Sequence, residues 1–104
     1  MRIEWTELAL LDMTAIRDYI AENSPENADR FIIRLFDVAE QLSEQPRMGR
    51  YVPEAGRQDV RELLFKDYRI IYRTKSAQVD ILTVIHGSRD LQRLKTKPWD
   101  TKSG

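Results

Sequence analysis

Three basic side chains in the second half of the sequence are the residues best suited to chemistry: Arg69, His86 and Arg89. An arginine is a fixed cation that holds a phosphate or a carboxylate, and a histidine can transfer a proton near neutral pH. His86 is the single histidine of the chain. His86 and Arg89 also have structural alternatives. A histidine at a strand end before Gly87 often serves as a hydrogen-bonded residue without catalysis, and Arg89 beside Asp90 can form a local ion pair.

Composition excludes several other kinds of site. The chain has no cysteine, so neither a disulfide nor a thiolate metal site can form, and one histidine makes structural zinc implausible. No glycine-rich nucleotide loop and no paired serine or cysteine nucleophile is recognisable. We therefore expect no cofactor and no metal. The apolar runs are too short to span a membrane and no export signal opens the chain, so we expect a cytoplasmic protein.

The charge is unevenly distributed. Residues 1–51 hold six Lys/Arg and ten Asp/Glu, a net charge of −4, whereas residues 52–104 hold eleven and seven, a net charge of +4. This is either two ordinary solvated surfaces or a basic face that meets an acidic partner or a phosphate backbone.

The first half of the chain has a helical period. A short strand is expected at residues 2–5, followed by helices near 7–22 and 25–44, with Thr6 and Ser24 as N-caps and Pro25 at a first helical position. The short connection predicts an antiparallel helix hairpin. The expected buried face of the first helix comprises Ala9, Met13, Ile16 and Ile20, widened by Leu8, Ala15 and Tyr19; that of the second comprises Ala28, Phe31, Ile32, Leu35, Ala39 and Leu42.

The period changes to two after a loop at residues 46–59, which predicts strands at 60–65, 68–74 and 78–86. The fold class is therefore α+β, with the helix hairpin on one face of a mainly antiparallel four-stranded sheet. The other face is expected to be open and to carry the working surface. The domain should span residues 1–94, with a polar tail at 95–104.

Four more residues are candidates for partner binding. Alternation places Arg69 and Arg73 on one face of the strand at 68–74, and places Arg61 with Leu63 and Phe65 on one face of the preceding strand, although such arginines are often solvated or paired across strands. On the second helix, Ile33 lies roughly 140° and Phe36 roughly 80° from Ala28 at 100° per residue. Ile33 and Phe36 are therefore expected to form an exposed edge, unless they are scattered surface residues.

Over residues 3–92 the chain resembles the RelE/ParE superfamily of toxins, one half of type II toxin–antitoxin pairs. The resemblance rests on these stretches in this order: Trp5 with the following helix, Asp18-Tyr19-Ile20, Pro46-Arg47-Met48-Gly49-Arg50, Pro53-Glu54, Val60-Arg61-Glu62-Leu63, Tyr68-Arg69-Ile70-Ile71-Tyr72-Arg73 and Val84-Ile85-His86-Gly87-Ser88-Arg89-Asp90. It implies a helix hairpin on a curved antiparallel sheet and a ParD-like or RelB-like antitoxin that wraps the toxin.

The superfamily holds two functional classes, RelE-like nucleases that cut mRNA on the ribosome and ParE-like proteins that poison DNA gyrase. Arg69 and Arg89 match basic positions of the nucleases. Two lysines expected before Arg69 are replaced by Val60 and Glu62, and the nucleases' C-terminal tyrosine falls at Lys95. A carboxylate in place of a lysine repels the scissile phosphate.

The neutral net charge and the pI of about 6.6 also disfavour a protein that grips RNA. We therefore prefer a ParE-like gyrase inhibitor that performs no chemistry. Some nuclease members use a histidine near the end of the last strand, so His86 keeps the ribosome-dependent endonuclease as the alternative. A toxin fold that has lost its toxicity is a third reading.

Overall fold

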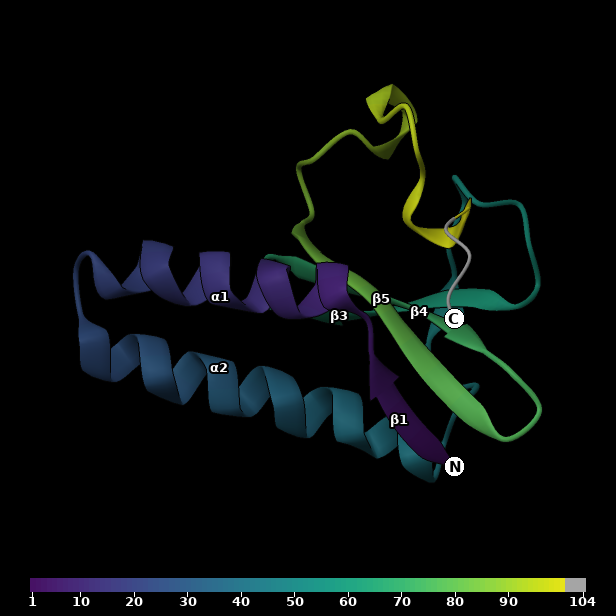
Figure 1. The fold of residues 1–104 in the computed structure, drawn as a ribbon, viewed down its shortest axis with the longest axis horizontal. Helices are drawn as coiled ribbons and strands as arrows, with labels where there is room; N and C mark the ends of the chain where they lie inside the picture. The colour runs from purple at the N-terminus through teal and green to yellow at the C-terminus, as the bar shows by residue number, and fades with distance from the viewer. Residues whose placement is uncertain (101–104) are drawn as a thin grey trace.

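Two antiparallel helices lie on one face of a five-stranded sheet in the computed structural model of the protein, which describes residues 1–100 (Figure 1). The predicted α+β class is confirmed. The helices are α1 (Glu7–Ala21) and α2 (Pro25–Glu40), and the strands are β1 (Arg2–Trp5), β2 (Arg50–Tyr51), β3 (Val60–Phe65), β4 (Tyr68–Thr74) and β5 (Gln78–His86). Short 3-10 helices follow at Gln41–Ser43, Leu91–Arg93 and Pro98–Asp100.

The predicted caps begin both helices. Thr6 Oγ1 accepts a hydrogen bond from the Ala9 backbone N–H, and Ser24 accepts one from Asn27. The Thr6 hydroxyl also lies 2.8 Å from the Ile81 carbonyl oxygen, to which it donates, so the cap of α1 anchors this helix to β5.

The sheet has the strand order β1-β5-β4-β3-β2, in which β1 runs parallel to β5 and the other pairs are antiparallel. The expected four strands were therefore one too few. The fifth strand, β2, lies inside the predicted loop and has only two residues, too short for alternation to reveal it. Between β3 and β4, Lys66 turns the chain with a φ of 53°, which costs a non-glycine residue strain.

Hydrophobic side chains form a core on each face of the sheet. The larger core lies under the helices and includes Leu35, Ile70, Tyr72 and Ile81. The second lies on the opposite face and comprises Val52, Val60, Ile71, Leu82, Ile85, Leu91 and Trp99. The expectation of an open second face was wrong over this area, because residues after β5 return to cover it.

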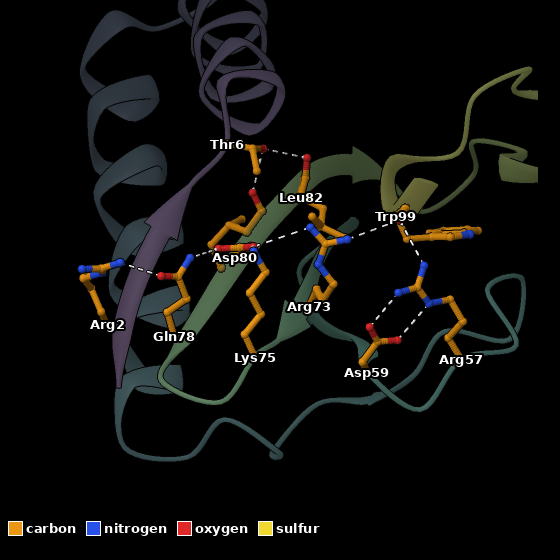
Figure 2. Close-up of polar contacts among 11 residues, drawn as sticks. Arg2, Thr6, Arg57, Asp59, Arg73, Lys75, Gln78, Asp80, Leu82 and Trp99 are labelled. Carbon is orange, nitrogen blue, oxygen red and sulfur yellow. Dashed lines mark hydrogen bonds and ion pairs between the residues drawn. The ribbon is translucent and has the colours of Figure 1, made fainter. Parts of the chain in front are cut away.

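A C-terminal cover, which we define as residues 91–100, makes the second core possible. Trp99 is 5% exposed, and its carbonyl oxygen accepts hydrogen bonds from Arg57 at 3.2 Å and Arg73 at 3.4 Å (Figure 2). The boundary expected at residue 94 leaves Trp99 in a polar tail, whereas its ring packs on the sheet. Residues 101–104 of that tail lie outside the described residues.

The outer side of α1 differs from the prediction. Leu8, Ala15 and Tyr19 were expected to widen the buried face, but all three are exposed, as is Leu11. The buried face of α1 consists of Ala9, Met13 and Ile16. An apolar residue type alone does not reveal which side of an amphipathic helix meets the sheet.

Candidate functional site

A hollow of about 520 Å³ lies on the second face of the sheet, where β3 and β5 end and β4 begins, beside the loop after β2. Two of the three predicted chemical residues, Arg69 and His86, line it together. Arg89 does not line it. The remaining lining residues are Arg50, Pro53, Glu54, Leu64, Lys66, Asp67, Tyr68, Gly87 and Ser88.

Arg69 is held by two carboxylates. Its Nη1 and Nη2 each lie 2.9 Å from one oxygen of Glu54, and its Nε lies 2.6 Å from Glu62 Oε1. This bidentate geometry is the strongest that a guanidinium forms with a carboxylate. The hydrogen bonds with Glu54 raise the pKa of Arg69, and the same contact lowers the pKa of Glu54. Arg69 is 8% exposed, so little of its charge is left for a ligand.

Glu62 ties this ion pair into the sheet. The residue is 1% exposed, and its second oxygen accepts a hydrogen bond of 2.6 Å from Arg50 Nε. A buried carboxylate is costly unless it is paired and hydrogen-bonded. Two arginines satisfy Glu62, so the four charges of Arg50, Glu62, Arg69 and Glu54 balance within the fold.

His86 is exposed at the end of β5. Its ring meets Tyr68 edge to face, with centroids 5.5 Å apart, and its Nδ1 accepts the Ser88 backbone N–H at 3.2 Å. The Ser88 hydroxyl lies 2.7 Å from the same nitrogen. Because Nδ1 is an acceptor here, the neutral ring carries its proton on Nε2, the nitrogen left for solvent. In this tautomer neither nitrogen offers a free lone pair for a general base.

Arg89 lies in the turn after β5, where its backbone N–H donates to the His86 carbonyl oxygen at 3.0 Å. Its side chain forms no ion pair with any carboxylate among residues 1–100. The local pair expected with Asp90 is not formed, because Asp90 contacts Arg93 instead, at 3.4 Å. Arg89 helps to lower the pKa of Asp12 on α1, although burial, the larger effect, raises that pKa overall.

The two arginines predicted for partner binding have different surroundings. Arg73 is buried between the Asp80 carboxylate, 3.6 Å away, and the Trp99 carbonyl (Figure 2), so it supports the C-terminal cover and is not presented to a partner. Arg61 lies near the molecular surface, stacked 4.2 Å from the centroid of the exposed Tyr51 ring. The structure does not bring Arg61 and Arg73 together.

The predicted edge at Ile33 and Phe36 is present on the outer side of α2. Ile33 is 59% exposed and Phe36 is 37% exposed, with its ring 4.6 Å from that of Trp5. An ion pair of 3.0 Å joins Arg17 of α1 to Asp29 of α2 across the antiparallel hairpin. Leu10 lies about two turns before Arg17 on α1, and Phe36 lies about two turns after Asp29 on α2. Because the helices are antiparallel, this spacing places Leu10 level with Phe36, and Leu10 is also exposed. Leu10, Ile33 and Phe36 thus define an apolar hairpin patch.

Sequence reasoning missed Glu54 and Leu10. Glu54 lies in a loop where no periodicity predicts its partner across the hollow. Leu10 lies roughly 100° from the buried Ala9 at 100° per residue, between the buried and the exposed side of the helix. No cluster of three or more potential metal ligands occurs among residues 1–100, and none of the helices in that range is long and apolar enough to cross a membrane.

Comparison with known proteins places this arrangement in a class of small bacterial toxins. Residues 3–91 match the family model described as the ParE toxin of the type II toxin–antitoxin system parDE, and the chain belongs to this family. It is 38% identical over 89 residues to Toxin RelE2 of Caulobacter vibrioides, covering 85% of the chain and 97% of that protein. It is 40% identical over 88 residues to the putative toxin Y4kP of Sinorhizobium fredii, covering 82% and 86%.

Two solved structures share the fold. A chain of the chromosomal ParDE toxin–antitoxin system of P. aeruginosa superposes with a TM-score of 0.70 at 25% identity, covering 83% of this chain and 95% of that one. A chain of the RelBE2 toxin–antitoxin complex of Mycobacterium tuberculosis superposes with a TM-score of 0.57 at 23% identity, covering 82% and 95%. The predicted RelE/ParE superfamily is confirmed.

Proposed function

We propose that this toxin inhibits DNA gyrase by binding, performs no chemistry of its own, and is neutralised by an antitoxin. The observation that carries the proposal is the closure of Arg69 by Glu54 and Glu62 at 2.6–2.9 Å. A nuclease needs cations free to stabilise charge that develops on the scissile phosphate. Here the Arg69 cation is already neutralised, and a phosphate that approached it would meet two carboxylates beside it.

The state of His86 supports the same proposal. Its Nδ1 is occupied by the Ser88 N–H, so the ring is not arranged as a general base. The zero net charge of the chain also offers little of the phosphate neutralisation from which RNA-binding proteins derive affinity. The match to the ParE family model favours this class as well.

A ribosome-dependent mRNA endonuclease remains the second candidate because His86 lies exposed in the hollow and Arg89, nearby in the chain, is unpaired among the described residues. These two side chains are available to RNA, and one curated relative bears the name RelE2. For this mechanism Arg69 would have to exchange its carboxylates for phosphate oxygens.

For the antitoxin we propose contact with the hairpin patch, Leu10, Ile33 and Phe36. Exposed apolar side chains gathered on two helices are typical of a protein interface, and both structural neighbours come from toxin–antitoxin systems. Hydrogen exchange on the complex with the protein encoded beside the toxin gene tests this contact. Unchanged exchange throughout α1 and α2 would contradict it.

Induced expression in bacteria tests the choice of target. DNA and protein synthesis are measured separately by pulse labelling, together with microscopy. Filamentation, DNA breaks and an SOS response before any fall in translation support the gyrase proposal. Immediate translation arrest with cleaved messages and intact DNA would replace it with the nuclease.

A further inference from the structure

A second cavity, of about 290 Å³, lies where β3 begins and β4 ends, at the opposite end of these strands from the hollow. Its lining consists of Arg47, Tyr51, Gln58, Asp59, Arg61 and Thr74, and we call it the Tyr51 pocket. The two cavities have no lining residue in common. The Tyr51 pocket is therefore separate from the hollow that contains Arg69 and His86.

The Tyr51 pocket has an excess of positive charge. Arg47 is exposed and forms no ion pair with a carboxylate among residues 1–100, and the same is true of Arg61. Asp59 also lines the pocket, but Arg57 neutralises it through two bonds of 2.9 and 2.7 Å (Figure 2). Two guanidinium charges without a carboxylate therefore remain, and they favour an anionic ligand.

Arg61 is held firmly in this pocket and still has donors for a ligand. Its Nη1 donates to the Gly49 and Arg47 carbonyl oxygens at 2.8 and 3.3 Å, and its Nη2 lies 3.1 Å from the Tyr51 hydroxyl. Gly49 is itself fixed, because its N–H donates to the buried Tyr72 hydroxyl at 3.0 Å. A guanidinium has five N–H donors, so these three bonds leave two. A cation that is already positioned loses little freedom when a ligand binds.

Other hydrogen-bonding groups of the pocket are unpaired within residues 1–100. The side chains of Gln58 and Thr74 line the cavity and form no hydrogen bond in that part of the chain. Together with the free donors of Arg47 and Arg61, they surround the cavity with N–H and O–H groups. A phosphate has three strong acceptor oxygens, one more than a carboxylate. The number of free donors therefore favours a phosphate group.

The Tyr51 ring offers a surface on which a base can stack. The Arg61 guanidinium carbon lies 4.2 Å from the ring centroid, yet 51% of Tyr51 remains exposed. Proteins hold unpaired nucleotides on such rings beside cations, because every base has a face that stacks. A glutamate side chain has no such face. The exposed ring therefore favours a nucleotide over an acidic peptide.

We propose that the Tyr51 pocket binds one nucleotide unit, with its phosphate on Arg47 and Arg61 and its base on Tyr51. A free mononucleotide and an unpaired stretch of DNA or RNA present the same phosphate and base to the pocket. A single local contact of this kind is compatible with the zero net charge of the chain, which disfavours only an extended grip on nucleic acid. The proposal goes beyond the proposed function, which assigns no role to this pocket.

Titration of the purified toxin with thymidine 5′-monophosphate, followed by amide NMR shifts, tests the proposal. We expect the largest shifts at residues 47–52, 58–61 and 74. The hollow, at residues 66–69 and 86–88, should show none. Inorganic phosphate should bind at the same amides about tenfold more weakly, because stacking of one base contributes about that factor.

Two strands identify the source of the nucleotide. Ten-nucleotide oligothymidine and oligouridine are titrated in the same way. Binding of either strand at these amides at least tenfold more tightly than the monophosphate assigns the pocket to nucleic acid, DNA or RNA according to which is tighter. Binding no tighter than that of the monophosphate assigns it to the free nucleotide.

Two pairs of variants at exposed positions show which groups bind. Arg47→Glu should weaken the monophosphate at least tenfold, the size of one charge-assisted hydrogen bond. Arg30→Glu on α2 makes the same charge change at another exposed site and should leave the dissociation constant within twofold. Tyr51→Leu should reduce binding of the monophosphate to that of inorganic phosphate, whereas Tyr51→Phe keeps the ring and should bind like the original protein.

Four results would each overturn the proposal. They are the absence of a saturable shift in the millimolar range, shifts confined to the hollow, equal weakening by Arg47→Glu and Arg30→Glu, and equal binding of the monophosphate and an octaglutamate peptide. Equal binding of the monophosphate and inorganic phosphate would also contradict it, because the base would then contribute nothing. Neither gyrase nor ribosomes enter the titration, so its outcome and that of the target assay are independent.

Discussion

Arg69 and Glu54 meet as two parallel forks, with Nη1 and Nη2 each 2.9 Å from one carboxylate oxygen. They come from different elements, since Arg69 lies in β4 and Glu54 in the loop after β2. The pair therefore ties the loop to the sheet across the hollow. It also removes from the hollow the cation that the superfamily resemblance had marked as a phosphate ligand.

Removal of Arg69 should destabilise the fold. Arg69→Met leaves Glu62 buried with only Arg50 as its partner, and breaking a buried pair in this way costs about 3–5 kcal/mol in the free energy of unfolding. Urea denaturation measures the loss. The matched control is Arg17→Met, whose pair with Asp29 is largely exposed and should cost less than about 1 kcal/mol.

The double variant Arg69→Met/Glu62→Leu sharpens this test. Removing both buried charges should recover part of the stability lost by Arg69→Met, because the penalty arises from an uncompensated buried carboxylate. Equal losses for Arg69→Met and Arg17→Met, or no recovery in the double variant, would show that the buried ion pair does not stabilise the fold as described.

Acid should weaken the protein partly through Glu54. Contact with Arg69 lowers the pKa of Glu54 below the ordinary value of 4.5. The unfolded chain therefore takes up this proton first as the pH falls, so the stability that Glu54 contributes is complete above about pH 4.5 and is lost as the pH falls through its folded pKa. Glu54→Gln removes this contribution. The difference in unfolding free energy between the two proteins should shrink from pH 7 to pH 3, and a constant difference would contradict the assignment.

The helices, the three longer strands and the residues that alternate across them were predictable because each rests on a local period or cap. Arg69 and Arg73 do share a face, and Ile33 and Phe36 are exposed. The partners of Arg69 were not predictable, since Glu54 and Glu62 reach it from other segments. Burial of Trp99 also depends on the chain's return after Gly87, which no periodicity indicates.

Trp99 should be needed for full stability. Its ring is buried against the second core, and Trp99→Ala should cost about 3–5 kcal/mol in the free energy of unfolding, as large-to-small changes in a core do. Thermal and urea denaturation both measure it, with the exposed Lys95→Ala as the control. An unchanged melting temperature for Trp99→Ala would mean that the C-terminal cover does not pack on the sheet.

His86 separates the two candidate functions in the cell. For a gyrase inhibitor, His86→Gln should leave toxicity largely intact because no proton is transferred. For a nuclease, loss of a general acid or base typically costs 10²–10⁴-fold in rate, which abolishes toxicity at modest expression. Growth arrest is scored after confirming that the variant still binds the antitoxin. A folded, antitoxin-binding but harmless His86→Gln would favour the nuclease.

The most direct measurement of the central claim is a gyrase supercoiling assay with the purified toxin. Relaxed plasmid, gyrase and ATP are incubated with increasing toxin, and a parallel reaction contains ribosomes translating a defined message. We predict that the toxin blocks supercoiling and leaves the message intact, and that His86→Gln does the same. Unimpaired supercoiling at toxin concentrations that cut the message on the ribosome would contradict the account.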